Sequence, residues 1–185
     1  MMTRPPMRAA IVLGTRPEII KMAPIIDACA RFGMDAFILH TGQHYSANLD
    51  AVFFEQLRLP VPAYNMGIGN QPHRKQVGLM THAIRDVLAR ERPDVVIVQG
   101  DTITVLAATL AARWLGITVA HHEAGLRSHD PTMIEETNRV TTDHLSRAWS
   151  RTLPTWGLGL MGDLAAHSMP GRRSTIVARA RAPLG

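Results

Sequence analysis

Three carboxylates stand where a sheet of parallel strands would gather them. Asp101 follows the apolar segment 94–99, and Glu123 follows the apolar segment 117–121. Glu135 opens a helical pattern near the end of the regular part of the chain. Carboxyl groups in different surroundings can divide the roles of general acid and general base. The residue types therefore suggest proton-transfer chemistry at one edge of the sheet.

Basic side chains accompany these carboxylates. Arg16 and Lys21 follow the first apolar segment, 8–14, and Arg139 lies in the last helical pattern. Cations of this kind pair with phosphate oxygens, so the group suits a phosphorylated or nucleotide ligand. The turn at 14–18 joins a strand to a helix start and forms a natural anion site. It matches neither a dinucleotide fingerprint nor a P-loop.

Each candidate also has a purely structural interpretation, which the pattern leaves open. The turn at 14–18 is also compatible with an ordinary strand-to-helix connection carrying solvated basic residues. Asp101 is a suitable cap for the helix that follows it. Glu135 and Arg139 are four residues apart on a helix, where they would form a common surface ion pair. The polar loop 41–45 suits plain solvent exposure.

The run His121, His122 and Glu123 raises the question of a metal site. Successive residues of an extended segment point to opposite faces, so the two histidines are poorly placed to share one ion. The run also differs from the HExxH zinc motif. We therefore expect no metal at this run.

Strands and helices have to alternate along the chain to bring these residues together. Apolar segments at 8–14, 34–40, 94–99 and 117–121 predict buried strands. Helical patterns occupy 15–32, 50–58, 72–92, 102–115 and 135–146. This order predicts an α/β fold, a Rossmann-like parallel sheet with helices on both faces. Such sheets bind ligands at the carboxyl ends of their strands.

Composition and charge exclude several classes of protein. The chain has no apolar run of the roughly 18 residues that a membrane helix needs, and its N-terminus does not resemble a signal peptide. Its single cysteine, Cys29, fits a small core residue in a reducing, cytoplasmic setting. The net charge of +5 comes from residues 147–185, which hold six arginines and one acid, Asp163. The neutral body argues against a nucleic-acid partner.

Five motifs occur in series: GTRPEIIKMAPII, TGQHY, VQGDT, HHEAGLRS and EETNRVTTDHLS. Over residues 8–146 the chain resembles the non-hydrolysing UDP-N-acetylglucosamine 2-epimerase family. That resemblance implies the N-terminal half of a two-domain, glycosyltransferase-B-like fold with the nucleotide sugar between the domains. It also implies interconversion of UDP-N-acetylglucosamine and UDP-N-acetylmannosamine by UDP elimination and re-addition. Neither a cofactor nor a metal is implied, and the assembly expected is a homodimer.

The resemblance assigns a role to each candidate residue. The catalytic carboxylates would be Asp101, Glu123 and Glu135, and the substrate-binding cations would be Arg16, Lys21 and Arg139.

Gln43 and His44 fall in the loop that helps to hold a second, regulatory nucleotide sugar in bacterial members of the family. Two residues depart from the family pattern: His122 stands where Val is common, and Ile134 where Pro is common.

Residues 147–185 do not continue the family pattern. We interpret 1–146 as the epimerase domain, and 147–185 as a divergent basic tail that is either disordered or the product of a frameshift. The resemblance then implies that the UDP-binding domain is absent and that this chain by itself turns over little substrate. Two alternatives stay open: a hydrolysing relative that releases free N-acetylmannosamine, and a non-catalytic half-domain that binds a nucleotide sugar.

Overall fold

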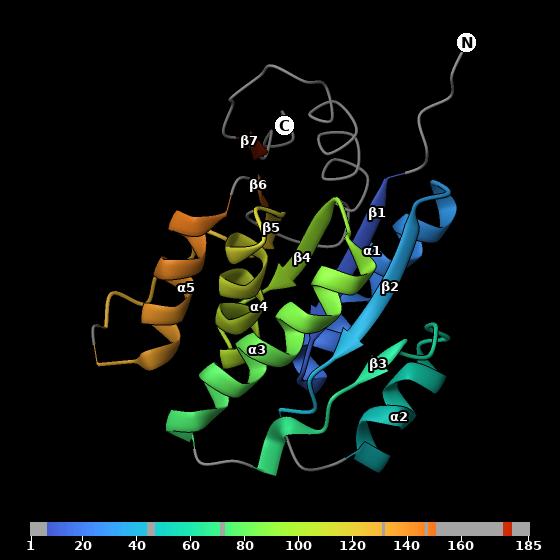
Figure 1. Cartoon of the computed structure of the whole chain (residues 1–185), viewed down its shortest axis with the longest axis horizontal. Coiled ribbons are helices and arrows are strands. Elements are labelled where there is room, and N and C mark those ends of the chain that lie inside the picture. The colour runs from blue at the N-terminus through green and yellow to red at the C-terminus, as the bar shows by residue number, and fades with distance from the viewer. Residues whose placement is uncertain are drawn as a thin grey trace, which may run out of the picture.

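A single parallel sheet organises the chain in the computed structural model (Figure 1). The structure describes residues 7–43, 47–70, 73–130, 132–146, 148–150 and 176–178. The strands run in the order β3-β2-β1-β4-β5-β6-β7. Their bounds are β1 Arg8–Leu13, β2 Asp35–His40, β3 Tyr64–Asn65, β4 Val95–Gln99, β5 Thr118–His122, β6 Ala148–Ser150 and β7 Ile176–Ala178. This arrangement confirms the predicted α/β, Rossmann-like fold.

The helices connect successive strands and cover both faces of the sheet. Figure 1 shows α3 and α4 in front of the strands and α1 behind them. The helices are α1 Arg16–Arg31, α2 Ala47–Gln56, α3 His73–Glu91, α4 Ile103–Trp114 and α5 Ile134–Leu145, with a 3₁₀ turn, η1, at Ile68–Asn70. Each lies within a few residues of a predicted helical pattern. None of the described helices has the length and apolarity of a membrane span.

Three short strands were not predicted. β3 and η1 lie in the Pro- and Gly-rich stretch between the predicted helical patterns 50–58 and 72–92, and a two-residue strand is too short to show alternation. β6 and β7 lie within 147–185, and both pair in parallel register at the sheet edge beyond β5. The rest of that range lies outside the described residues, so the domain boundary at 146 and the nature of the tail stay predictions.

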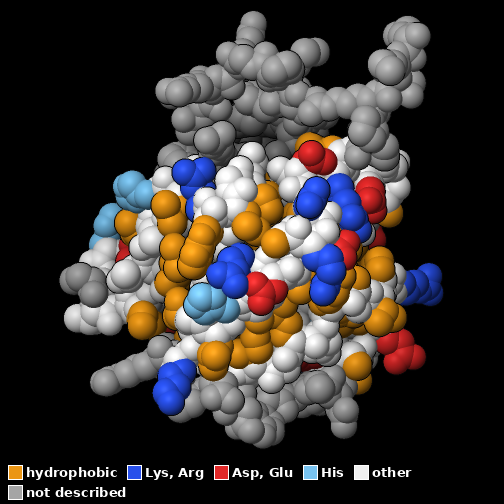
Figure 2. All heavy atoms as spheres, in the orientation of Figure 1, with side chains coloured by type: hydrophobic (Ala, Val, Ile, Leu, Met, Phe, Trp, Pro, Cys, Tyr) orange, Lys and Arg blue, Asp and Glu red, His pale blue; other side chains and the backbone are white. Residues whose placement is uncertain are grey.

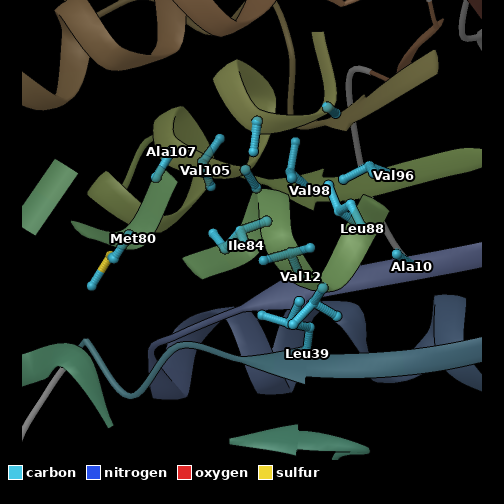
Figure 3. Close-up of a cluster of buried hydrophobic side chains, with 14 of the residues drawn as sticks. Ala10, Val12, Leu39, Met80, Ile84, Leu88, Val96, Val98, Val105 and Ala107 are labelled. Atoms are coloured by element: carbon cyan, nitrogen blue, oxygen red, sulfur yellow. The ribbon is translucent and has the colours of Figure 1, made fainter. Parts of the chain in front are cut away.

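Two hydrophobic cores lie on opposite faces of the sheet because side chains alternate along each strand. In β1, Ala9, Ile11 and Leu13 pack against α1. Ala10 and Val12 face the other way, towards α3 and α4, and Figure 3 shows them in one cluster with Leu39, Met80, Ile84 and Leu88. Both faces of β1 and β4 are therefore buried, which explains their continuous apolar sequences.

Cys29 is a residue of α1 and lies in the core between that helix and the sheet, as its helical position predicted. It is 1% exposed, and burial raises the pKa of its thiol to about 11. The neutral thiol therefore behaves as a small hydrophobic side chain.

The face formed by α3 and α4 carries basic, acidic and hydrophobic side chains side by side (Figure 2). On these helices Arg85 lies 2.8 Å from the carboxylate of Asp86, and its guanidinium stands 5.1 Å from the centre of the Trp114 ring. The basic groups visible on this face are thus interspersed with other types and form no continuous basic surface.

Candidate active site

The first cluster of the site joins the carboxyl ends of β4 and β5 to α1. The ammonium group of Lys21 lies 3.0 Å from Glu123 Oε2, and Gln99 Nε2 donates to the same oxygen. Glu123 follows β5 directly and has a φ of 67°, in the left-handed region. A non-glycine residue adopts this conformation only when its surroundings enforce it, and such residues concentrate at functional sites.

The second cluster joins the turn after β4 to α5. Arg139 forms an ion pair with the carboxylate of Asp101, and its other terminal nitrogen lies 3.2 Å from Glu136 Oε2. Asn138 Nδ2 donates to the backbone oxygen of Asp101 at 3.0 Å. Thr102, not Asp101, caps α4, because its hydroxyl accepts from the Val105 amide. The capping interpretation of Asp101 is therefore wrong.

Glu135 and Glu136 have different surroundings although they are neighbours. Glu135 is exposed, and none of the ion pairs within the described residues includes it. Glu136 is buried and accepts from the Ser128 amide at 3.1 Å. That backbone hydrogen bond is the main cause of its lowered pKa, to which Arg139 also contributes. The expected surface pair between Glu135 and Arg139 is replaced by the contact of Arg139 with Glu136.

Sequence reasoning missed Glu136 because two consecutive glutamates at a helix start look alike. Helical neighbours point about 100° apart, since a turn takes 3.6 residues, so only one of them can face the sheet. The only available signal was the doublet itself, which showed that one glutamate would face inwards without showing which.

The N-terminus of α1 holds no vacant anion site, which corrects the prediction for 14–18. The carboxylate of Glu18 accepts from the amides of Gly14 and Thr15 at 2.7 and 2.8 Å, and from the Thr102 hydroxyl at 2.6 Å. Burial outweighs these hydrogen bonds and raises the pKa of Glu18. An internal carboxylate thus takes the place that a ligand phosphate would otherwise occupy.

Arg16 lies apart from the two clusters. Its Nε is 3.4 Å from Oδ1 of Asp50, a buried residue of α2, and Asp50 Oδ2 lies 3.5 Å from His40 Nε2. The structure therefore brings Lys21 and Arg139 to the carboxylates, while Arg16 points towards the neighbouring helix.

Gln43 connects the loop after β2 to the start of α4. Its side-chain oxygen accepts from the amide and the hydroxyl of Thr104, at 3.1 and 2.8 Å. His44 lies outside the described residues. The proposed regulatory role of this pair stays a prediction.

The two adjacent histidines have separate environments. His121 is fully buried and contacts Asp143 and Gly100, whereas the Nδ1 of buried His122 has no hydrogen-bond partner. Burial is the main cause of the lowered pKa of His122. Within the described part of the chain, no three His, Cys, Asp or Glu side chains are grouped in a way that would hold a metal ion.

The two carboxylates thus follow neighbouring strands, and a cation from a helix pairs with each. Glu123 and Asp101 are 19% and 27% exposed at the side chain, so solvent and a ligand can reach them. Lys21 is 48% exposed, and an exposed ion pair of this kind is weak enough to exchange partners. The arrangement can move protons through the carboxylates and attract an anionic ligand through the cations.

Comparison with known proteins gives one consistent family. The family model for UDP-N-acetylglucosamine 2-epimerase matches residues 27–151. The UDP-N-acetylglucosamine 2-epimerase of Methanocaldococcus jannaschii is 58% identical over 140 residues. A UDP-2,3-diacetamido-2,3-dideoxy-D-glucuronate 2-epimerase of Pseudomonas aeruginosa is 42% identical over 141 residues. Each alignment covers 76% of this chain, and 38% and 40% of the relatives.

A solved structure agrees with these sequence matches. The crystal structure of the M. jannaschii UDP-GlcNAc 2-epimerase, in complex with UDP-GlcNAc and UDP, superposes with a TM-score of 0.75 at 51% sequence identity. The match covers 88% of this chain and 44% of that protein. The chain thus spans less than half the length of the relatives to which it is similar.

Proposed function

The chain belongs to the UDP-N-acetylglucosamine 2-epimerase family, and from this premise we propose that it forms the N-terminal side of an active site for UDP-N-acetylglucosamine. The observation that carries the proposal is the pairing of Lys21 with Glu123 and of Arg139 with Asp101 at adjacent strand ends. Groups of both charges meet there, where a parallel sheet binds its ligands.

The proposed reaction needs both kinds of group. Elimination of UDP removes the proton at C2 of the sugar and breaks the bond from C1 to the phosphate oxygen. A carboxylate takes the proton, and cations stabilise the negative charge on the departing diphosphate. Re-addition of UDP and return of the proton to the other face of C2 complete the epimerisation.

We assign the proton transfers to the carboxylates and the binding of the diphosphate to the cations. The carboxylates are Asp101, Glu123 and Glu135, and the cations are Arg16, Lys21 and Arg139. Ligand binding would draw Lys21 away from Glu123, which frees that carboxylate. For Arg16 to take part, it has to leave Asp50 and turn towards the ligand.

Two measurements on the chain test this proposal. Calorimetry with UDP-N-acetylglucosamine measures binding, and NMR in heavy water detects deuterium at C2 of the sugar. We expect binding, with C2 exchange lost in Glu123→Gln. Exchange is the more sensitive readout because elimination and re-addition leave deuterium at C2 even when the sugar re-forms with its original configuration. Absence of binding contradicts the proposal.

The same experiment separates the alternatives. Binding without C2 exchange favours the non-catalytic half-domain, and release of free N-acetylmannosamine favours a hydrolysing enzyme. The P. aeruginosa relative supports a second candidate substrate, a UDP-2,3-diacetamido-2,3-dideoxyglucuronate. Tighter binding of that nucleotide sugar than of UDP-N-acetylglucosamine would identify it as the ligand.

A further inference from the structure

A buried carboxylate on α5, Asp143, takes no part in the proton transfers assigned above. It is 3% exposed. Its Oδ1 lies 2.7 Å from His121 Nδ1, and its Oδ2 accepts from the Gly125 amide at 3.0 Å and lies 2.7 Å from Arg127 Nη1. Burial alone would raise the pKa of Asp143, but the hydrogen bonds from His121, Arg127 and Gly125 together lower it. Both oxygens of the side chain are therefore engaged.

His121 links this carboxylate to the neighbouring strand. The ring is fully buried, and its Nε2 lies 2.7 Å from the backbone oxygen of Gly100. The Gly100 oxygen can only accept a hydrogen bond, and so can the Asp143 carboxylate. The geometry therefore matches a His121 ring that donates from both nitrogens, with Asp143 as its counter-ion.

The contacts of this pair lie beside both proposed catalytic carboxylates. Gly100 immediately precedes Asp101, and its φ of 83° turns the chain at the end of β4. Gly125 lies two residues after Glu123, whose own φ is 67°. The Gly100 amide also donates to the backbone oxygen of His122 at 3.1 Å. One network thus holds the turn after β4 and the turn after β5 in a fixed relation.

We propose that Asp143 and His121 are positioning residues that jointly fix the backbone carrying Asp101 and Glu123. The pair touches no proposed reacting group and acts through the backbone at Gly100 and Gly125. The strained conformation of Glu123 needs such support, because left-handed backbone persists only where its surroundings enforce it. This inference rests on the proposed function for its catalytic meaning, while the geometry of the pair can be tested separately.

The first test uses the unmodified chain. A long-range ¹H–¹⁵N spectrum at neutral pH reports whether each ring nitrogen of His121 carries hydrogen. We expect both ring nitrogens of His121 to carry hydrogen. Arg127 and His122 are the other cationic or titratable groups near this ring. A His121 ring with one bare nitrogen would overturn the proposal.

The second test is Asp143→Asn, with Asp130→Asn as the matched control. In either orientation of the new amide, its NH₂ group faces a hydrogen-bond donor, so one side of the network is lost. Asp130 lies in an exposed loop, where its carboxylate accepts from Thr132. We expect the ¹³Cδ resonance of Glu123 to shift in Asp143→Asn and to stay unchanged in Asp130→Asn.

The Glu123 resonance distinguishes positioning from simple stabilisation. If the Glu123 resonance shifts while the amides of β4 stay protected from hydrogen exchange, the proposal is supported. Lower stability with an unchanged Glu123 resonance overturns it. If Asp143→Asn does not fold, Arg127→Gln provides the same readout, because it removes a partly exposed donor from Asp143. An unchanged Glu123 resonance in that variant also counts against the proposal.

Calorimetry links the pair to function. We expect Asp143→Asn to bind UDP-N-acetylglucosamine about tenfold more weakly than the unmodified chain, with Asp130→Asn unaffected. If the unmodified chain binds none of this ligand, the proposed function fails. The ring spectrum and the Glu123 resonance would then still decide whether the pair fixes the two turns.

Discussion

At the scale of single residues, Lys21 and Glu123 show how the site combines opposite charges. The side chain of Lys21 is half-exposed, so the ion pair contributes little to stability. The ammonium group can therefore reach a ligand. The other lysine, Lys75, lies on exposed helix surface in α3. The two lysines therefore offer a matched comparison.

Replacement of Lys21 by Met is expected to weaken UDP-N-acetylglucosamine binding about tenfold, because one of the cations proposed to bind the diphosphate is lost. Lys75→Met should bind as the unmodified chain does. Calorimetry at low and moderate salt measures both affinities. Equal affinity in the two variants would remove Lys21 from the proposed ligand site.

His122 gives a pH-dependent stability prediction. Its folded pKa is lowered from 6.5 by burial, so the unfolded chain binds this proton more readily than the folded one. Stability therefore falls as pH drops below about 6.5, since the unfolded state takes up more protons there. His122→Val should remove this loss of stability in acid. It also removes a buried nitrogen without a hydrogen-bond partner, and so should stabilise the fold by about 1 kcal/mol.

Denaturant unfolding of His122→Val at several pH values measures the effect. The gain over the unmodified chain should be larger in acid than in alkali. Buried His40, whose pKa burial also lowers, leaves its own pH dependence in both proteins. His144→Gln, at an exposed position of α5, is the control. A gain that does not vary with pH would contradict the lowered pKa of His122.

At the scale of elements, the turn between β1 and α1 depends on the close approach of three segments. A Cβ atom at Gly14 would overlap the hydroxyl oxygens of Thr41 and Thr104, and would lie 3.2 Å from Cβ of Gln43. Thr41 and Gln43 follow β2, and Thr104 lies in the first turn of α4. The absence of a side chain at Gly14 thus lets three strand-end segments meet.

Gly14→Ala is therefore expected to destabilise the chain by about 3 kcal/mol through overpacking. Gly78, within α3, has open space at its Cβ position, so Gly78→Ala should stabilise the helix by roughly 0.5–1 kcal/mol. Thermal and denaturant unfolding compare the two variants. Similar stabilities for both would contradict the packing described at Gly14.

At the scale of the whole molecule, Cys29 reports on the cooperativity of the fold. The thiolate is the reactive form of cysteine, and this thiol has a pKa of about 11 and is 1% exposed. The sulfur lies in the core that α1 shares with the sheet. A thiol reagent should therefore reach it only after that core opens.

We expect thiol labelling of the native chain to be slow, and to accelerate with denaturant in parallel with the loss of helical circular dichroism. The fully unfolded chain provides the reference rate. Rapid labelling without denaturant would show that the core around α1 opens independently of the sheet.

The sequence alone determined the fold class, the four central strands and the strand ends that carry the candidate site residues. Parallel strands buried on both faces must be apolar throughout, so β1 and β4 are visible without a structure. The residues that follow each strand are then known from the chain order, which is how Asp101 and Glu123 could be selected. The family motifs are short runs of consecutive residues, so they too can be recognised without a structure.

Only the tertiary structure decided which charged groups pair. Arg139 pairs with Asp101 and Glu136, although Glu135 is one helical turn away from it. Arg16 contacts Asp50 of α2, Glu18 fills the anion site at its own helix start, and Asp143 reaches His121. These partners come from different elements, and their distances depend on how helices pack on the sheet. Local sequence sets the position of a residue in its own element, whereas packing between elements sets its partner.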